Sequence, residues 1–372
     1  MKKFLPALLV LLLTALACNG GTPALPPTPG ISIFDSGKTA YGFFPVPPEP
    51  KVASAFQLFE DMGKHGDFVL IQQATAWEEF VSNPEGESQT RTDLINQTKL
   101  AHQNGLEYIF VLDPLNGLNR REFIGLPAEW EASFANPNVR SAHRNYTLWV
   151  VRTFQPRYLG LASEINTYMD AHPDDAPNFI SLYNEIYALV KAEAPETKIF
   201  VTFQWDDLNN MFTQPEEGSR QRMSPNWEQV EAFEPNLDIW AISTYPYFIF
   251  PSASDIPADY YFPLLARTEK PVAVAEGGFT SQGIDPLKAA PEDQVAYLNA
   301  INDQLGGPRF VFWVNLLLTD FNTEAMTEFM LANGQSADDL DILRYFGHTG
   351  FQNSDRSPKP ALEVWDVFRS ER

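Results

Sequence analysis

The sequence predicts a single (β/α)8 barrel of the α/β class, and three observations lead to that prediction. Apolar, strand-like runs alternate with helical stretches from about residue 38 onward, and eight such runs can be distinguished. The runs lack polar alternation, so both faces of each strand are expected to be buried, as in a parallel sheet. Eight strand–helix units in about 330 residues match the size of such a barrel.

The individual elements follow from apolar runs bounded by turn and cap residues. One helix, for example, is expected to begin at Ser88 and to end before Gly105, a typical helix stop. The expected strands are 41–46, 68–73, 108–113, 159–164, 199–205, 239–245, 272–276 and 310–315. The expected helices are 52–64, 88–104, 138–154, 177–194, 227–233, 256–268, 291–305, 324–332 and 361–368.

The alternative fold is an open doubly wound sheet. No G-x-G-x-x-G or G-x-x-x-x-G-K-(S/T) motif follows the first strand, so nothing in the sequence supports it. No internal repeat and no second linker is visible, and residues 38–372 are therefore expected to form one domain.

The first residues have the pattern of an export signal. Residues 1–18 consist of a basic start, an apolar run too short to span a membrane, and Cys18. The segment Thr14-Ala-Leu-Ala-Cys18 resembles a bacterial lipobox, which implies lipidation of Cys18. An ordinary secretory peptide is the alternative. Residues 19–37, rich in Gly, Pro and Thr near their start, are expected to form an extended tether.

The composition excludes several functions. The formal net charge of −22 disfavours nucleic acids and anionic lipid surfaces as partners. Cys18 is the only cysteine, so neither a disulfide nor a cysteine metal site is expected in the mature chain. The 5 histidines show no H-x-H or H-E-x-x-H spacing, and no metal or cofactor is expected.

Two glutamates carry the functional prediction. Glu164 and Glu276 each stand at the end of an apolar run, where a (β/α)8 barrel keeps its catalytic groups. Two carboxylates on different strands are what glycoside hydrolysis needs.

Five motifs, in the right order along the chain, resemble those of the clan of retaining glycoside hydrolases with (β/α)8 barrels. They are the Ser-Glu-Ile-Asn at 163–166, the Ser-Thr-Tyr-Pro at 243–246, the run 270–278 ending in Glu276-Gly-Gly, Phe312-Trp313, and the chain ending from Gly347 to Trp365.

The resemblance implies roles for these residues. Glu276 is expected to be the nucleophile and Glu164 the acid/base of a double displacement. Tyr245 is expected to contact the nucleophile, and Trp313 to form the floor of a sugar subsite. The sequence departs from the family at Ser163, where the family has an asparagine that binds the sugar 2-hydroxyl.

Further candidates for sugar binding follow the expected strands. Trp77 could stack on a sugar or equally cap the helix layer. Asp113 could bind hydroxyls or serve the turn formed with Pro114. Gln204 and Trp205 suit a subsite, and Asn166 could support Glu164 or touch substrate.

The preferred function is a lipid-anchored or secreted, extracytoplasmic glycoside hydrolase acting on an oligo- or polysaccharide. The main alternative is a non-catalytic sugar-binding lipoprotein on the same barrel, which Ser163 keeps open. A solute-binding lipoprotein of a transporter is disfavoured, because such proteins are bilobed. No protein partner is expected.

Overall fold

The computed structural model describes residues 32–82, 86–212, 223–285, 287–332 and 343–372. The expected signal sequence, the lipidation site Cys18 and the tether as far as residue 31 lie outside these described residues.

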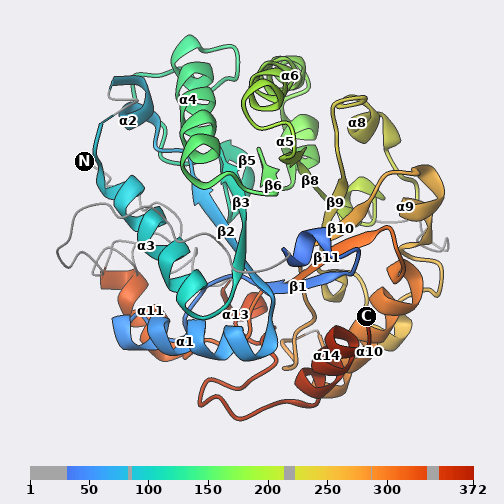
Figure 1. The fold of residues 1–372 in the computed structure, drawn as a ribbon. Coiled ribbons are helices and arrows are strands. Elements are labelled where there is room, and N and C mark those ends of the chain that lie inside the picture. Colours follow the sequence, from blue (N-terminus) through green and yellow to red (C-terminus); the bar gives the residue numbers. More distant parts are fainter. Residues whose placement is uncertain (1–31, 83–85, 213–222, 286, 333–342) are drawn as a thin grey trace.

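Nine of the described strands form one parallel sheet that closes into a barrel (Figure 1). The order of the 9 strands within the described residues is β7-β6-β3-β2-β1-β11-β10-β9-β8. The two outermost members, β7 and β8, are successive pieces of one run separated by Val201 alone. Together they occupy one strand position, so the barrel has eight positions. The first strand pairs with the last, with Ala40 opposite Phe312. The predicted single (β/α)8 barrel is therefore confirmed.

The strands agree with the predicted runs to within a few residues. The barrel strands are β1 (Ala40–Phe43), β2 (Phe68–Ala74), β3 (Glu107–Asp113), β6 (Tyr158–Gly160), β7 (Lys198–Phe200), β8 (Thr202–Gln204), β9 (Trp240–Thr244), β10 (Val272–Gly277) and β11 (Phe310–Asn315). A separate antiparallel hairpin, β4 (Leu115–Asn116) and β5 (Asn119–Phe123), follows β3.

The helices form a layer around the sheet (Figure 1). They are α1 (Val52–His65), α2 (Trp77–Ser82), α3 (Gln89–Gln103), α4 (Pro137–Phe154), α5 (Ile165–Ala171), α6 (Ala176–Glu193), α7 (Trp205–Leu208), α8 (Trp227–Glu231), α9 (Phe262–Arg267), α10 (Pro291–Leu305), α11 (Thr323–Ala332), α13 (Leu343–Phe346) and α14 (Pro360–Glu371). The helix expected over 256–268 is limited to α9, because the residues before it form turns that place Tyr260 and Tyr261 in the core.

The interior of the barrel is filled by aromatic rings at its N-terminal end. Phe312 lies at the centre, with ring centroids 6.0 Å from Phe68, 5.2 Å from Tyr158 and 5.9 Å from Phe200. Space for Phe68 comes from Gly42 on the neighbouring strand, where an added Cβ would lie 2.6 Å from the ring. This layer closes one end of the barrel and leaves the other for polar groups.

The segment before β1 covers this closed end. Ser32 and the backbone of Ile33 donate hydrogen bonds to the Glu107 carboxylate, both of 2.6 Å. The ring of Phe34 lies 5.4 Å from that of Phe68 and 5.1 Å from that of Tyr158. The tether was expected to run to residue 37, but Ser32 to Asp35 are packed on the barrel, because Phe34 gains an apolar site against Phe68 and Tyr158.

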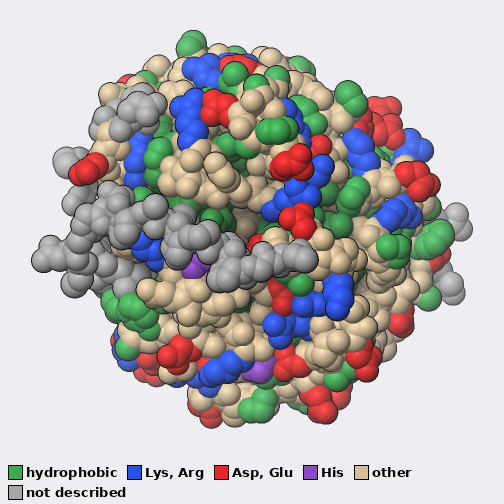
Figure 2. Space-filling model, in the orientation of Figure 1, with side chains coloured by type: hydrophobic (Ala, Val, Ile, Leu, Met, Phe, Trp, Pro, Cys, Tyr) green, Lys and Arg blue, Asp and Glu red, His purple; other side chains and the backbone are tan. Residues whose placement is uncertain are grey.

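Figure 2 shows one face of the molecule, on which basic and acidic side chains are interspersed. None of the helices in the described part of the chain is long and apolar enough to cross a membrane.

The aromatic layer around Phe312, which forms the floor of the barrel, leads to a prediction about stability. Phe312 is fully buried, so Phe312→Ala should lower the free energy of unfolding by about 3–5 kcal/mol through lost burial and a new cavity. Phe262 is 58% exposed, and Phe262→Ala should have little effect. Urea unfolding of the two variants checks this, and equal losses would contradict the central role of Phe312.

Candidate active site

The β4–β5 hairpin brings an arginine over the end of the barrel. The turn between its strands is Gly117-Leu118, and the Asn116 side chain accepts the Leu118 N–H at 3.0 Å. Phe123 fastens the base of the hairpin, with its ring 4.7 Å from that of Phe134 and 5.8 Å from that of Trp77. Arg120, on β5, is buried.

The Arg120 guanidinium joins three carboxylates. Its Nε donates to Glu164 Oε2 at 2.9 Å, and its Nη1 donates to Asp113. Its Nη2 lies 3.4 Å from Ser163 Oγ and 3.8 Å from Glu276 Oε2. The predicted site residues Asp113, Ser163, Glu164 and Glu276 therefore do come together, around an arginine that the sequence did not single out.

Asp113 is fixed by more than this ion pair. Gln72 on β2 donates to its Oδ2 at 2.8 Å, and the backbone N–H of Leu115 donates to its Oδ1 at 3.1 Å. Both carboxylate oxygens are thus engaged within the protein, which indicates that Asp113 holds Arg120 and the hairpin.

Glu164 does not end a strand, as predicted, but begins α5 in a left-handed conformation (φ 51°, ψ 43°). This conformation is uncommon for a residue with a side chain, and it is held by a hydrogen bond from the Glu164 N–H to Thr202 Oγ1 of 2.8 Å. The turn directs the carboxylate into the site, where Ser243 Oγ on β9 donates to Oε1. Ser163 Oγ lies 3.1 Å from the same Thr202 hydroxyl.

Glu276 lies near the end of β10 and accepts a hydrogen bond from the Tyr245 hydroxyl to Oε1 of 2.8 Å. Tyr245 is itself positioned by Asp206, which accepts its backbone N–H at 3.2 Å and the hydroxyl of Tyr260. The contact between Tyr245 and the second glutamate, suggested by the sequence, is present in the structure.

Asn166 and Gln204 support the site from behind. The Asn166 Oδ1 accepts the Gln204 N–H at 2.8 Å, and its Nδ2 lies 3.2 Å from the Gln204 carbonyl oxygen. The Gln204 side chain accepts the Asp207 N–H at 2.6 Å and donates to Asp206 at 3.0 Å. These contacts join α5 to the end of β8 and to α7. Asn166 and Gln204 therefore hold these elements in place behind the site.

The three tryptophans expected to contact sugar are buried elsewhere. Trp313 is fully buried and faces the helix layer, with its ring 5.2 Å from Trp365 and 5.9 Å from Tyr41. Because neighbouring residues of a strand point to opposite faces, it is Phe312 that points into the barrel. The expectation that Trp313 floors a sugar subsite is therefore corrected.

Trp77 and Trp205 are also buried, each in a different part of the structure. Trp77 donates through Nε1 to the carbonyl oxygen of Ile124 at 2.6 Å and packs beneath the hairpin. Trp205 is fully buried between Trp227 and Tyr261, at centroid distances of 6.1 and 6.3 Å. For Trp77 the structural alternative is the one observed, and neither ring is available to stack on a ligand in this structure.

Burial dominates the electrostatics of the site. Desolvation, followed by the charge of Glu164, raises the pKa of Glu276 to about 7, although Arg120 and the Tyr245 hydroxyl oppose the shift. Burial also raises the pKa of Asp113, against the opposing effect of Arg120. Burial disfavours the charged form of Arg120, but the carboxylates of Asp113, Glu164 and Glu276 outweigh it and raise the Arg120 pKa.

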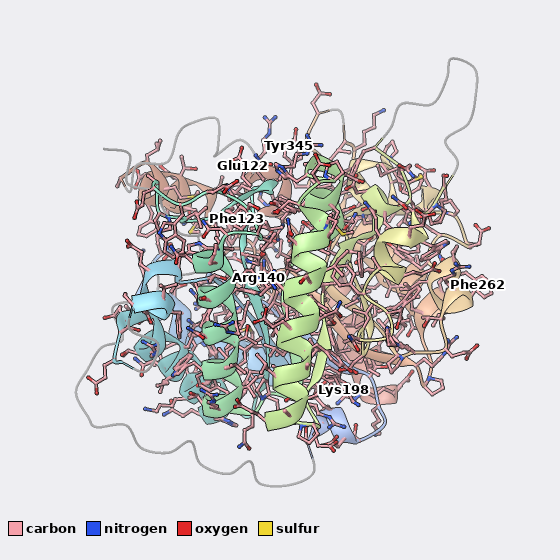
Figure 3. All side chains as sticks on the ribbon, turned by 90° about the horizontal axis from the view of Figure 1, so that it is seen from above. Glu122, Phe123, Arg140, Lys198, Phe262 and Tyr345 are labelled. Carbon is pink, nitrogen blue, oxygen red and sulfur yellow. The ribbon has the colours of Figure 1, made fainter. Side chains whose placement is uncertain are left out.

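The site lies at the C-terminal end of the strands. Figure 3 shows Glu122 and Phe123 of the hairpin at the same end of the molecule as Tyr345, and Lys198, the first residue of β7, at the opposite end. No group of three or more His, Cys, Asp or Glu side chains among the described residues is arranged to hold a metal ion.

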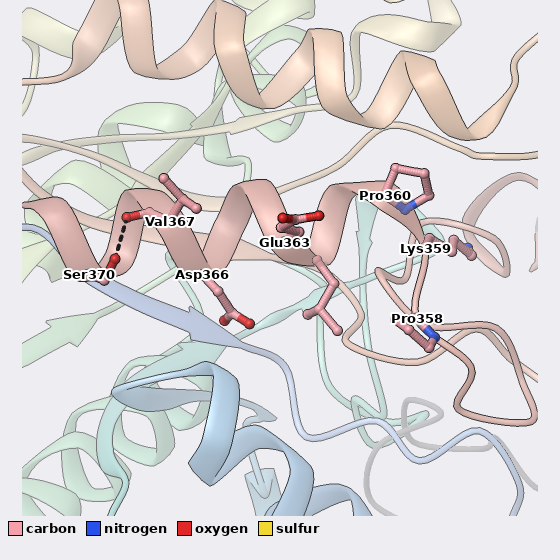
Figure 4. Close-up of a pocket in the computed structure, with 8 residues that line it drawn as sticks. Pro358, Lys359, Pro360, Glu363, Asp366, Val367 and Ser370 are labelled. Carbon is pink, nitrogen blue, oxygen red and sulfur yellow. Dashed lines mark hydrogen bonds between the residues drawn. The ribbon is translucent and has the colours of Figure 1, made fainter.

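A hollow of about 650 Å3 lies along the outer side of α14, between Pro358 and Ser370 (Figure 4). None of its lining residues contacts Glu164, Glu276 or Arg120, so it is separate from the candidate active site.

The fold is shared with solved glycoside hydrolases. The exo-beta-1,4-mannosidase Op5Man5 from Opitutaceae bacterium strain TAV5 is 15% identical, with a TM-score of 0.62 over 90% of this chain and 60% of that one. Xylanase 10B from Thermotoga maritima is 10% identical, with a TM-score of 0.58 over 91% and 98%. A family 39 glycoside hydrolase from Bacteroides cellulosilyticus WH2 is 15% identical, with a TM-score of 0.54 over 92% and 65%.

At these identities the likeness establishes the (β/α)8 barrel fold. The chain spans 60% of the length of the mannosidase. No family model matches the sequence, and no curated protein matches it.

The shifted pKa of Glu276 predicts a pH dependence of stability. Burial raises the pKa from 4.5 to about 7, so the folded protein keeps a proton that the unfolded chain releases, and stability falls as pH rises through that window. Glu276→Gln removes this titration. The unfolding free energy of the variant minus that of the wild type should therefore be about 3 kcal/mol larger at pH 8 than at pH 4.

Urea unfolding at several pH values measures this difference. Glu269→Gln provides the control, because it removes one carboxylate that is fully exposed and lies outside the site. A constant difference between Glu276→Gln and the wild type would show that Glu276 titrates normally.

Proposed function

We propose that this chain is a retaining glycoside hydrolase that cleaves O-glycosidic bonds of an oligo- or polysaccharide. The observation that carries the proposal is the pair Glu164 and Glu276, which reach the same guanidinium from opposite parts of the barrel rim. This rim is where barrels of this kind place their catalytic groups, and the solved proteins that share the fold include a mannosidase and a xylanase.

In the proposed mechanism, a Glu276 oxygen attacks the anomeric carbon while the bond to the leaving oxygen breaks. The leaving oxygen takes the electron pair of that bond and a proton from Glu164. Glu164 then removes a proton from water, which attacks the anomeric carbon and releases Glu276. The Tyr245 hydroxyl, bound to Glu276 at 2.8 Å, orients the nucleophile.

A lipid anchor at Cys18 and an extracytoplasmic location belong to the same proposal. They are supported by the signal-like residues 1–18 and by the lipobox resemblance.

The second candidate function is sugar binding without catalysis. Two features favour it: Ser163 replaces the asparagine of the resembled family, and Arg120 pairs with Glu164, the residue assigned as general acid. The same experiment separates the two functions.

The test is hydrolysis of a panel of aryl glycosides and polysaccharides by the purified protein. Glu164→Ala should lose about 10²–10⁴-fold in activity, because a positioned acid/base contributes that much. Glu276→Ala should lose activity to the background level, and the exposed control Glu269→Ala should keep it.

Added azide distinguishes the two roles. It should restore activity to Glu164→Ala with a glycosyl azide of retained configuration, and to Glu276→Ala with inverted configuration. The opposite pattern would exchange the roles. Polysaccharide binding without turnover, unchanged in both variants, would establish the sugar-binding alternative.

A further inference from the structure

Three aromatic side chains, Phe248, Tyr345 and Phe346, lie next to Tyr245 at the rim of the barrel. Phe346 contacts Tyr245 directly, with ring centroids 5.0 Å apart, and the Phe248 ring lies 5.8 Å from that of Phe346. The Tyr345 ring follows at 5.7 Å from Phe248. Because the Tyr245 hydroxyl is bonded to Glu276, this group of rings begins one tyrosine side chain away from the proposed nucleophile. The three residues are called the aromatic platform below.

Phe248 is placed by the turn that follows β9. Residues Pro246–Phe248 form a single 3-10 turn, in which the Phe248 N–H donates to the Tyr245 carbonyl oxygen at 3.1 Å. Side chains three residues apart lie one above the other in such a turn, and the rings of Tyr245 and Phe248 are 6.4 Å apart. Tyr247, which is fully buried, packs against Phe248 with ring centroids 4.5 Å apart. The turn that brings Tyr245 to Glu276 therefore also fixes Phe248 beside it.

The short helix α13 carries the other two rings and is fastened to the end of β11. The Thr349 hydroxyl donates to the Phe346 carbonyl oxygen at 2.9 Å. The Thr349 carbonyl oxygen in turn accepts a hydrogen bond of 3.0 Å from the side chain of Asn315. Because Asn315 is the last residue of β11, Tyr345 and Phe346 are held at the C-terminal end of the barrel, where Figure 3 shows Tyr345.

The platform is accessible, unlike the tryptophans that the sequence suggested for sugar binding. Phe248 is 38% exposed, and Tyr345 and Phe346 are partly exposed, whereas Trp205 and Trp313 are fully buried. Arg344 lies 5.0 Å from the centre of the Tyr345 ring and covers part of it. A pyranose ring can present a face of C–H groups, which packs well on the negative face of an aromatic ring. Exposed rings beside a catalytic centre are therefore suited to hold a sugar.

The charge of the adjoining site favours an uncharged sugar. Asp113, Glu164 and Glu276 meet a single guanidinium, that of Arg120, so acidic groups outnumber the cation there. The carboxylate of a uronic acid would be brought close to these groups and would be repelled by them. A neutral sugar has no such cost.

We propose that the aromatic platform binds an uncharged pyranose unit next to the unit that Glu276 attacks. The length of Tyr245 leaves room for the attacked unit at the glutamates and places a neighbouring unit on Phe248 and Phe346. The ligand is therefore a neutral oligo- or polysaccharide rather than a small glycoside. The assignment of this ligand as a substrate rests on the glycosidase function proposed above.

A comparison of two substrates tests the platform. The value of kcat/KM is measured for a neutral polysaccharide and for the aryl glycoside of the same sugar, which has no neighbouring sugar unit. Phe248→Ala and Phe248→Ala/Tyr345→Ala should lower the value for the polysaccharide by a larger factor than the value for the aryl glycoside. The ratio of the two values should fall by about 2–10-fold for each ring removed, the usual contribution of an aromatic contact.

Matched variants separate binding from structure. Phe248→Tyr keeps the ring and should keep the ratio, and Phe262→Ala, which removes an exposed ring at the side of the molecule, should match the wild type (Figure 3). A purely structural role of Phe248 would lower both values by the same factor and would overturn the proposal, as would a polyuronide preferred over every neutral polysaccharide. If Phe248→Ala does not fold, Phe248→Leu keeps the apolar volume without the ring and should lower the same ratio.

Electrophoresis in native gels that contain a soluble neutral polysaccharide separates this inference from the proposed function. The polysaccharide should retard the wild type, or Glu276→Ala where the wild type consumes it. The retardation should weaken when Phe248→Ala/Tyr345→Ala is added and persist when Phe262→Ala is added.

The outcomes of the two experiments are distinct. Retardation of a wild type that hydrolyses nothing, weakened in the double variant, would support the platform and refute the glycosidase function. Hydrolysis with an unchanged ratio of kcat/KM values would refute the platform and leave the glycosidase function intact. Neither hydrolysis nor retardation with any neutral polysaccharide would refute both.

Discussion

The ion pairs of Arg120 hold together three acidic side chains at the rim of the barrel. Asp113 ends β3, Glu164 begins α5, and Glu276 lies on β10, so the residues that meet at the guanidinium come from distant parts of the sequence. Three ionised carboxylates buried side by side would each lose hydration, and the guanidinium supplies a compensating charge. The arginine therefore makes the arrangement of the rim possible.

Much of the fold follows directly from the sequence, because each barrel strand is a short apolar run with turn residues on both sides. The positions of Glu164 and Glu276 were also predictable, since a polar residue after such a run falls on the barrel rim. The aromatic side chains were not. Whether Phe312 or Trp313 faces the interior depends on strand register, and a shift of one residue exchanges the two faces.

Arg120 was missed for a different reason. It lies in the long segment after β3 that carries no apolar pattern, and its importance appears only when the hairpin folds back onto the barrel. The Asn116-Gly117 pair was a usable signal, because Asn-Gly between short runs is typical of a tight hairpin. Nothing local could have indicated which carboxylates the arginine would meet.

The packing of Phe34 against the aromatic floor has a consequence for orientation. Whatever precedes Ser32 joins the barrel at its closed end, on the side opposite the two glutamates. If the chain is anchored through Cys18, as proposed above, the point at which the anchoring segment meets the barrel lies on the face opposite the rim. A large polymer in the surroundings could then approach the glutamates without having to pass between the protein and the lipid surface.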